Sequence, residues 1–177
     1  MDDAREALPP WPDDEFVDYA QARQHTLLRA AYLVCGDLRT AEELLRSALV
    51  QLARQWDRVR EEQPDLVVRR QLYRDAVASW RHRQSEQVGT TPGPEELEEP
   101  GDDEEVERRR EVLRALDHLT PRQRAVVVLR WFEERSEGDA AQVLGCSVGT
   151  VRTEEVEALG RLRAALPRAD LGAGGAR

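Results

Sequence analysis

The chain has 177 residues, enough for one ordinary domain or two small ones. It has no lysine and no isoleucine, few aromatic residues and much leucine, alanine, arginine and glutamate, which favours helices over strands. The formal net charge of −9, taken as a total, argues against a nucleic-acid partner. The chain has no long apolar run, so we expect neither a membrane span nor a signal peptide.

The first half of the chain predicts a helical domain over residues 13–84. Asp13 to Glu15 suit a helix start, Gly36 suits its end, the Thr40–Glu43 capping box suits a second start, and Pro64 opens a third helix. Apolar residues recur at helical spacing between these signals. The side chains that we expect to be buried are Phe16, Tyr19, Ala20, Leu27, Ala31, Val34, Leu44, Leu45, Ala48, Leu52, Trp56, Leu66, Val67, Leu72, Val77 and Trp80.

An acidic segment follows this domain. Residues 89–107 carry nine acidic side chains and no basic one, whereas residues 108–168 carry twelve arginines against nine acids. Because a partner responds to the charge nearest to it, the total charge does not exclude a polyanion at the C-terminal part. Prolines, glycines and like charges cannot bury enough apolar surface to offset the ordering entropy, so residues 85–105 are predicted to be a flexible linker.

The remaining sequence predicts a second helical domain over residues 106–167. Thr120-Pro121 and Ser136 are helix starts, Gly145 suits a left-handed turn, and Ser147 caps a last helix. The stretch from Val126 to Phe132 continues the helix that Thr120-Pro121 begins. The apolar stripes of this domain are Val112, Leu113, Leu116 and Leu119, and then Val148, Val151, Val156, Leu159, Leu162 and Leu166.

Two helices, residues 137–144 and 148–166, are joined in this prediction by a tight turn. Ala140 and Ala141 are small where the first helix approaches the second, and Val148 and Val151 are placed to fix the second helix to the core. This is the sequence form of a helix-turn-helix. An ordinary helical hairpin uses the same signals, so the spacing alone leaves both interpretations open.

The sequence shows none of the common catalytic arrangements. The three histidines, His25, His82 and His118, are scattered, and Cys35 and Cys146 have no metal-ligand spacing. Neither a phosphate-binding glycine loop nor a nucleophile elbow is present. We therefore expect a cytoplasmic protein that is not an enzyme, has reduced thiols and needs no cofactor or metal.

The motifs of the chain resemble a known family. LTPRQRAVVVLR and LGCSVGTVR, within Leu113 to Leu166, resemble the C-terminal promoter-binding domain of extracytoplasmic-function sigma factors, with the SigE-like actinobacterial group closest. FVDYAQARQHTLLRAAYLVCGDLRTAEELLRSAL looks like the family's polymerase-binding helices, and VRRQLYRDAVASWRHR looks like its promoter-melting helix. Together these stretches cover nearly all of the predicted helical sequence.

The resemblance implies an all-α fold and the function of an alternative sigma factor. Core RNA polymerase and promoter DNA would be its partners, and an anti-sigma factor is a further candidate. The acidic linker would either mimic nucleic acid in the polymerase cleft or act as a solvated spacer. The implied DNA-binding residues are Arg69, Arg70, Arg74, Trp80, Arg81 and Arg83 at the minus-ten element, and Arg122, Arg124, Ser147, Thr150, Arg152 and Thr153 at the minus-thirty-five element. The implied polymerase-binding residues are Glu42, Glu43, Leu44 and Arg46.

The chain also departs from the family pattern. Arg46 and Ser47 replace a glutamine and an acid of the second helix, and Arg74 and Ala78 replace an asparagine and an aspartate of the promoter-melting helix. Trp80 is retained, but a tryptophan there is also compatible with a core position.

The recognition helix holds the largest departure. Family members carry small, polar and basic residues there, whereas this chain has Glu154, Glu155 and Glu157. A glutamate accepts a hydrogen bond from cytosine, but negative charge near phosphates is unfavourable. These positions motivate a second hypothesis, a sigma-like protein that binds polymerase or a regulatory partner without ordinary promoter recognition.

Overall fold

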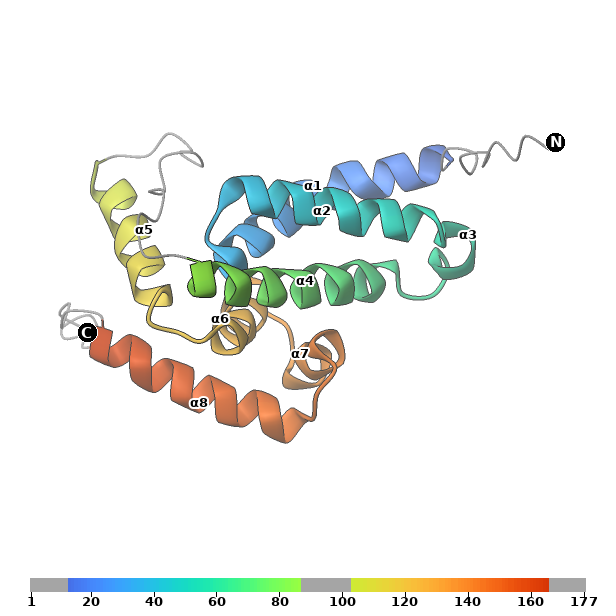
Figure 1. Ribbon diagram of the computed structural model, residues 1–177. Coiled ribbons are helices and arrows are strands. Elements are labelled where there is room, and N and C mark those ends of the chain that lie inside the picture. The colour runs from blue at the N-terminus through green and yellow to red at the C-terminus, as the bar shows by residue number, and fades with distance from the viewer. Residues whose placement is uncertain (1–12, 87–102, 166–177) are drawn as a thin grey trace, which may run out of the picture.

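The computed structural model describes residues 13–86 and 103–165, and the side chains of residues 80–86, 103–106, 108 and 109 lie outside that description. Every regular element in these two ranges is a helix, so the all-α prediction is confirmed there (Figure 1). No helix in the same ranges is long and apolar enough to cross a membrane. They also contain no group of three or more residues placed to hold a metal ion.

The N-terminal half consists of α1 (Asp14–Cys35), α2 (Leu38–Ala53), the short α3 (Trp56–Val59) and α4 (Pro64–Glu86). Helices α1, α2 and α4 pack against one another around fully buried side chains such as Leu27, Leu52 and Leu72 (Figure 1). Burying leucine side chains of this kind contributes roughly 2 kcal/mol each, which is the main stabilisation of the bundle.

The ends of the N-terminal helices follow local sequence signals with one exception. Asp13 caps α1, and Gly36 ends it with a φ of 76°, a left-handed conformation that glycine adopts without strain. The prediction that Thr40 and Glu43 begin the second helix is wrong. Helix α2 begins at Leu38, because the Asp37 carboxylate accepts the Thr40 amide at 2.7 Å and so provides the cap three residues earlier.

The C-terminal half consists of α5 (Asp103–Leu116), α6 (Pro121–Val127), the π-helical turn η2 (Val128–Phe132), α7 (Glu137–Leu144) and α8 (Val148–Ala165). The predicted starts at Thr120, Ser136 and Ser147 are confirmed, since each hydroxyl accepts a backbone N–H of the following turn at 3.1 to 3.2 Å. Gly145 ends α7 in the left-handed conformation, as predicted.

The two halves pack against each other. Helix α4 contacts α6 and α7, and α1 contacts α6 and η2. One cluster of buried apolar residues runs through both halves, from Leu72 of α4 to Leu129 of η2 and Val151 of α8. Helix α4 continues to Glu86 and α5 begins at Asp103, so both extend into the segment predicted as a linker, and the rest of that segment lies outside the described residues.

Several apolar side chains of the C-terminal half are exposed. Val156 is 71% exposed, Val112 and Val148 are also exposed, and so are Trp131, at 61%, and Phe132 of η2. The expectation that Val148 and Val156 face the core is wrong because α8 packs through a narrow row that includes Val151 and Ala158, so apolar residues away from that row remain at the surface. The expected burial of Trp80 and Leu166 concerns side chains outside the described residues.

Candidate nucleic-acid interface

Helices α7 and α8 form a helix-turn-helix on the outside of the molecule. The turn at Gly145 has a φ of 62°, and the small side chains of Ala140 and Ala141 are buried on α7. Helix α7 packs against α4 on one side and against α8 on the other. This arrangement leaves α8 at the edge of the molecule, with its start open to solvent (Figure 1).

The start of α8 carries polar groups suited to a nucleic acid. Ser147 caps the helix, and its hydroxyl lies 2.9 Å from that of Thr150. Together with Thr153, and with Glu154 and Glu157, they line a shallow depression that is open to solvent. Hydroxyl groups and backbone N–H groups at a helix start are common contacts of DNA phosphates.

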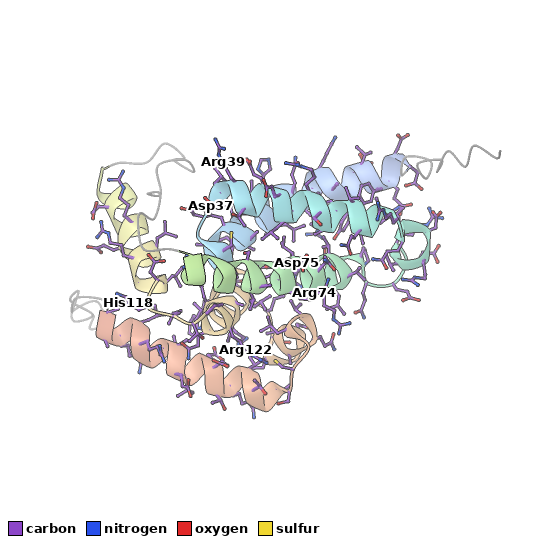
Figure 2. All side chains as sticks on the ribbon, viewed as in Figure 1. Asp37, Arg39, Arg74, Asp75, His118 and Arg122 are labelled. Atoms are coloured by element: carbon purple, nitrogen blue, oxygen red, sulfur yellow. The ribbon has the colours of Figure 1, made fainter. Side chains whose placement is uncertain are left out.

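The glutamates of α8 bond with α6 and η2. Glu154 lies 3.7 Å from the Arg122 guanidinium, and Figure 2 shows Arg122 on the side of α6 that faces α8. Glu155 lies 3.4 Å from the Arg130 guanidinium, and Glu157 accepts a hydrogen bond from the Gln123 amide at 3.0 Å. Two of the negative charges that argued against DNA binding, those of Glu154 and Glu155, are therefore paired within the protein, whereas Glu157 is exposed and bonds with a neutral amide.

Arg152 is the exposed cation near the start of the recognition helix. Its side chain is 67% exposed, and its Nε donates to Glu137 of α7 at 2.8 Å. An exposed ion pair of this kind contributes about 0 to 1 kcal/mol, because water solvates both charges well. A phosphate or a base edge can replace Glu137 at little cost, so Arg152 is available to DNA in this conformation.

Arg124 lies in a different environment from the exposed position expected of a DNA contact. It is 1% exposed, and its guanidinium donates to the Leu33 carbonyl of α1 and to Asp117 at 2.9 Å. Burial disfavours the charged form and lowers the pKa of Arg124, although Asp117 opposes that shift. In this conformation Arg124 joins the two halves of the protein and does not reach a phosphate.

Arg69, also expected to contact DNA, is buried between the two halves. Its Nε donates to the Glu133 carboxylate at 2.5 Å, and its Nη1 lies 3.2 Å from Asp65. Glu133 has a 2% exposed side chain and also accepts the Tyr73 hydroxyl at 2.7 Å. Burial opposes the charge of Arg69, but the attraction of Glu133 and then of Asp65 outweighs it and raises the pKa of Arg69.

The other α4 residues expected at the minus-ten element are placed differently from one another. Arg70 donates to the Gln142 carbonyl of α7 at 3.1 Å. Arg74 is exposed and donates to Gln71 and Asp75 of its own helix (Figure 2). The backbone at Trp80, Arg81 and Arg83 belongs to α4, but their side chains lie outside the described residues.

The residues expected to bind polymerase share one part of α2. Glu42, Glu43 and Arg46 are exposed, while Leu44 is half-buried and packs against the core of the N-terminal half. The arrangement places both signs of charge on a fixed helical surface.

Sequence reasoning did not find Glu133, Tyr73 and Asp65. These residues form a polar contact between the halves, with Arg135 3.8 Å from both Asp65 and Glu133. No local pattern marks them, because Tyr73 and Glu133 are 60 residues apart in the chain.

The sequence and the fold match known transcription proteins. The family model of sigma-70 region 4 matches residues 115–164, which include the helix-turn-helix. The RNA polymerase sigma-E factor of Streptomyces avermitilis is 36% identical over 160 residues, covering 90% of this chain and 89% of that protein. The sigma-E factor of Streptomyces coelicolor is 35% identical and covers 90% of each chain.

Two solved structures share the fold. The sigma factor RpoE of Bartonella quintana, crystallised with the anti-sigma factor NepR, superposes with a TM-score of 0.65 at 20% identity, covering 86% of this chain and 97% of that one. A chain of the PhyRSL–NepR complex from Sphingomonas sp. Fr1 gives a TM-score of 0.57 at 21% identity, covering 90% and 96%.

Proposed function

The chain belongs to the extracytoplasmic-function RNA polymerase sigma factors of the sigma-E type, and we propose from this that it directs core polymerase to the promoters of a specific regulon. One observation carries the proposal: identity to sigma-E factors extends over 90% of the chain and includes the helix-turn-helix, where Arg152 is exposed and pairs with Glu137 of α7. The protein would work in the cytoplasm, with promoter DNA as its ligand and no catalytic activity of its own.

Each half of the chain has its own role in this proposal. In this proposal residues 13–84 bind polymerase and the minus-ten element, residues 106–167 bind the minus-thirty-five element, and residues 85–105 connect them. An anti-sigma factor is a further proposed partner, because a structural neighbour of the chain is a sigma factor in complex with one.

The proposed DNA contacts fall into two groups. Ser147, Thr150, Arg152 and Thr153 are near solvent at the start of α8, and Arg122 borders them, so these contacts need no rearrangement. Arg69 and Arg124 are buried between the halves, so their contact with phosphates requires α6 and α7 to separate from α1 and α4. Arg70 is exposed and has only to release the Gln142 carbonyl, and Arg74 is also exposed.

The proposed polymerase contact uses Glu42, Glu43, Leu44 and Arg46 of α2. Reversing the charge at Glu43 places an arginine where the proposed interface needs an acid. Glu43→Arg is expected to weaken binding to core polymerase about tenfold in a titration, consistent with roughly 1.4 kcal/mol for a well-placed interface charge. Glu61→Arg, at another exposed glutamate outside α2, is the matched control and should leave binding unchanged.

The decisive experiment is run-off transcription with purified core polymerase and the full chain on a library of genomic promoters. Initiation from a defined subset is expected. Arg152→Glu should lower promoter binding and its salt dependence, while Arg58→Glu on α3 should not. Binding to core polymerase without initiation from any promoter would contradict the proposal, and promoter binding that Arg152→Glu leaves unchanged would remove α8 from it.

A further inference from the structure

Two exposed valines flank the exposed arginine of the recognition helix. Val148, Arg152 and Val156 are spaced four residues apart on α8, and all three are exposed, Val156 at 71%. Because four helical residues turn about 400°, the three side chains form one row along the helix. Because these two valines are exposed at the outer edge of the molecule, their methyl groups are accessible to a ligand.

The row contains no acidic residue of its own, although Arg152 in its middle pairs with Glu137 of α7. Glu154 and Glu155 bond with Arg122 and Arg130, and Glu157 bonds with Gln123, which holds these acids toward α6 and η2. Glu154 and Glu157 also line the open depression beside Ser147 and Thr150, and the row itself is apolar at both ends and cationic in the middle. That surface suits a ligand with an anionic or acceptor-rich centre between two apolar groups.

The edges of base pairs in the major groove provide such a ligand. Thymine is the base that presents a methyl group there, and guanine presents two acceptors, O6 and N7, that match the two donors of an arginine. Helical residues four apart lie about 6 Å apart along the axis, which is roughly two base-pair steps of 3.4 Å. The row of about 12 Å therefore covers roughly four base pairs, the length that a recognition helix reaches in one groove.

We propose that Val148 and Val156 determine promoter specificity by contacting thymine 5-methyl groups on either side of a guanine that Arg152 recognises. This inference rests on the proposed function, since it names the bases that the helix-turn-helix selects. The ion pair between Arg152 and Glu137 does not prevent it, because an exposed pair exchanges readily for a guanine.

The test begins with the DNA. Holoenzyme assembled from core polymerase and the full chain selects its upstream element from a duplex pool randomised in that region. Each thymine of the selected element is then replaced by deoxyuridine, which lacks only the 5-methyl group. At two positions flanking a guanine, holoenzyme affinity is expected to fall about fourfold, the effect of one buried methyl.

The variants identify the side chains. Val156→Ala should lower the affinity of the holoenzyme for thymine-containing DNA by a similar factor. At one of the two methyl-sensitive positions, deoxyuridine should then cause no further loss of affinity. Val148→Ala should show the same behaviour at the other position. Replacing the intervening guanine with 7-deazaguanine should weaken the wild type but not Arg152→Gln. Val112→Ala, at another exposed valine on α5, is the matched control and should respond to both base analogues as the wild type does.

The outcomes separate this inference from the function on which it rests. Failure to select any element would overturn the sigma-factor proposal and the valine row together. Two other outcomes would contradict only the proposal that Val148 and Val156 contact thymine methyl groups. The first is a selected element in which no position is sensitive to loss of the methyl group. The second is equal methyl sensitivity in the wild type and in both valine variants. Weaker binding of Val156→Ala to core polymerase without DNA would show a protein contact instead, and would also overturn that proposal.

Discussion

At the scale of single residues, Glu133 and Glu134 show how position changes the role of identical side chains. Glu134 is exposed in a left-handed backbone conformation, with a φ of 53°, whereas the Glu133 carboxylate is buried against Arg69 and Tyr73. The π-helical turn before them closes with a hydrogen bond from the Glu133 amide to the Val128 carbonyl at 2.9 Å. Because this hydrogen bond spans five residues instead of four, the chain leaves the turn with the Glu133 side chain against Arg69 and Tyr73 of α4.

Removing the charge of Glu133 should therefore be costly. Glu133→Gln leaves the buried Arg69 with Asp65 as its remaining anionic partner, and we expect the free energy of unfolding to fall by about 3 kcal/mol. Urea denaturation measures the loss. Glu134→Gln, one residue further on and exposed, is the control and should change stability by less than about 0.5 kcal/mol. Equal losses in the two variants would contradict the assigned role of the buried carboxylate.

Asp65 provides a test at acidic pH. Burial acts to raise its pKa, but the nearby charge of Arg69 and the hydrogen bond from the Tyr19 hydroxyl at 2.8 Å outweigh it and lower the pKa of Asp65. A carboxyl whose pKa is lower in the folded state stabilises the fold above its unfolded pKa of about 3.9, and that contribution disappears as the pH falls through the folded value.

Asp65→Asn should accordingly be less stable than the wild type at pH 6, and the difference should shrink as the pH falls below about 4. Unfolding free energies measured by denaturant titration between pH 6 and pH 2 check this. Asp57→Asn, at an exposed aspartate of α3, is the control and should follow the wild-type curve. A difference that stays constant over the whole pH range would contradict the prediction.

At the scale of elements, local signals predicted where most helices begin and end. Gly36, Thr120, Ser136, Gly145 and Ser147 act where they were expected, because a cap depends on a few adjacent residues. The start of α2 was predicted three residues late, since two caps compete there and the Asp37 carboxylate is the one used. Periodicity indicated an apolar face on α8 but not how much of that face the neighbouring helices bury. Val156 was therefore assigned to the buried face, whereas it lies at the surface.

Two glycines of the helix-turn-helix should respond to alanine with opposite signs. At Gly145 a Cβ meets no atom within 4 Å, so Gly145→Ala costs only the left-handed conformation, about 1 kcal/mol. At Gly160, inside α8 and equally open, Gly160→Ala should raise stability by about 0.5 to 1 kcal/mol, because alanine has the higher helix propensity. Thermal or urea unfolding of both variants measures these changes in stability. A change of the same sign in both variants would contradict the left-handed conformation assigned to Gly145.

At the scale of the whole molecule, the packing of the two halves had no counterpart in the sequence. Composition predicted two helical domains and an acidic connection, and the shared core between α4, η2 and α8 joins residues far apart in the chain. For the same reason Arg69 and Arg124, expected at the surface, lie inside the molecule, whereas Arg152 and Thr153 lie near solvent as their local sequence suggested. Which of these residues bind DNA stays a prediction.

A shared core predicts coupled unfolding. Leu129 of η2 is fully buried in the cluster that also contains Leu27 and Leu72. Leu129→Ala should lower the free energy of unfolding by about 3 kcal/mol. Amide exchange should speed up in α1 and α4 as much as in α6, because one core holds them together. Val50→Ala, at an exposed valine of α2, is the control and should change neither. Faster exchange confined to the C-terminal half would show two independently folded units.

The contacts of Glu133 also bear on how the protein would compete for its ligand. A guanidinium that holds a carboxylate is occupied, so Arg69 cannot bind Glu133 and a DNA phosphate at the same time. In the proposed contact with the minus-ten element, Glu133 would therefore compete with a DNA phosphate for Arg69 from a fixed place in the same molecule. The apparent strength of that one contact would be its intrinsic strength multiplied by the fraction of molecules in which Arg69 and Glu133 are apart.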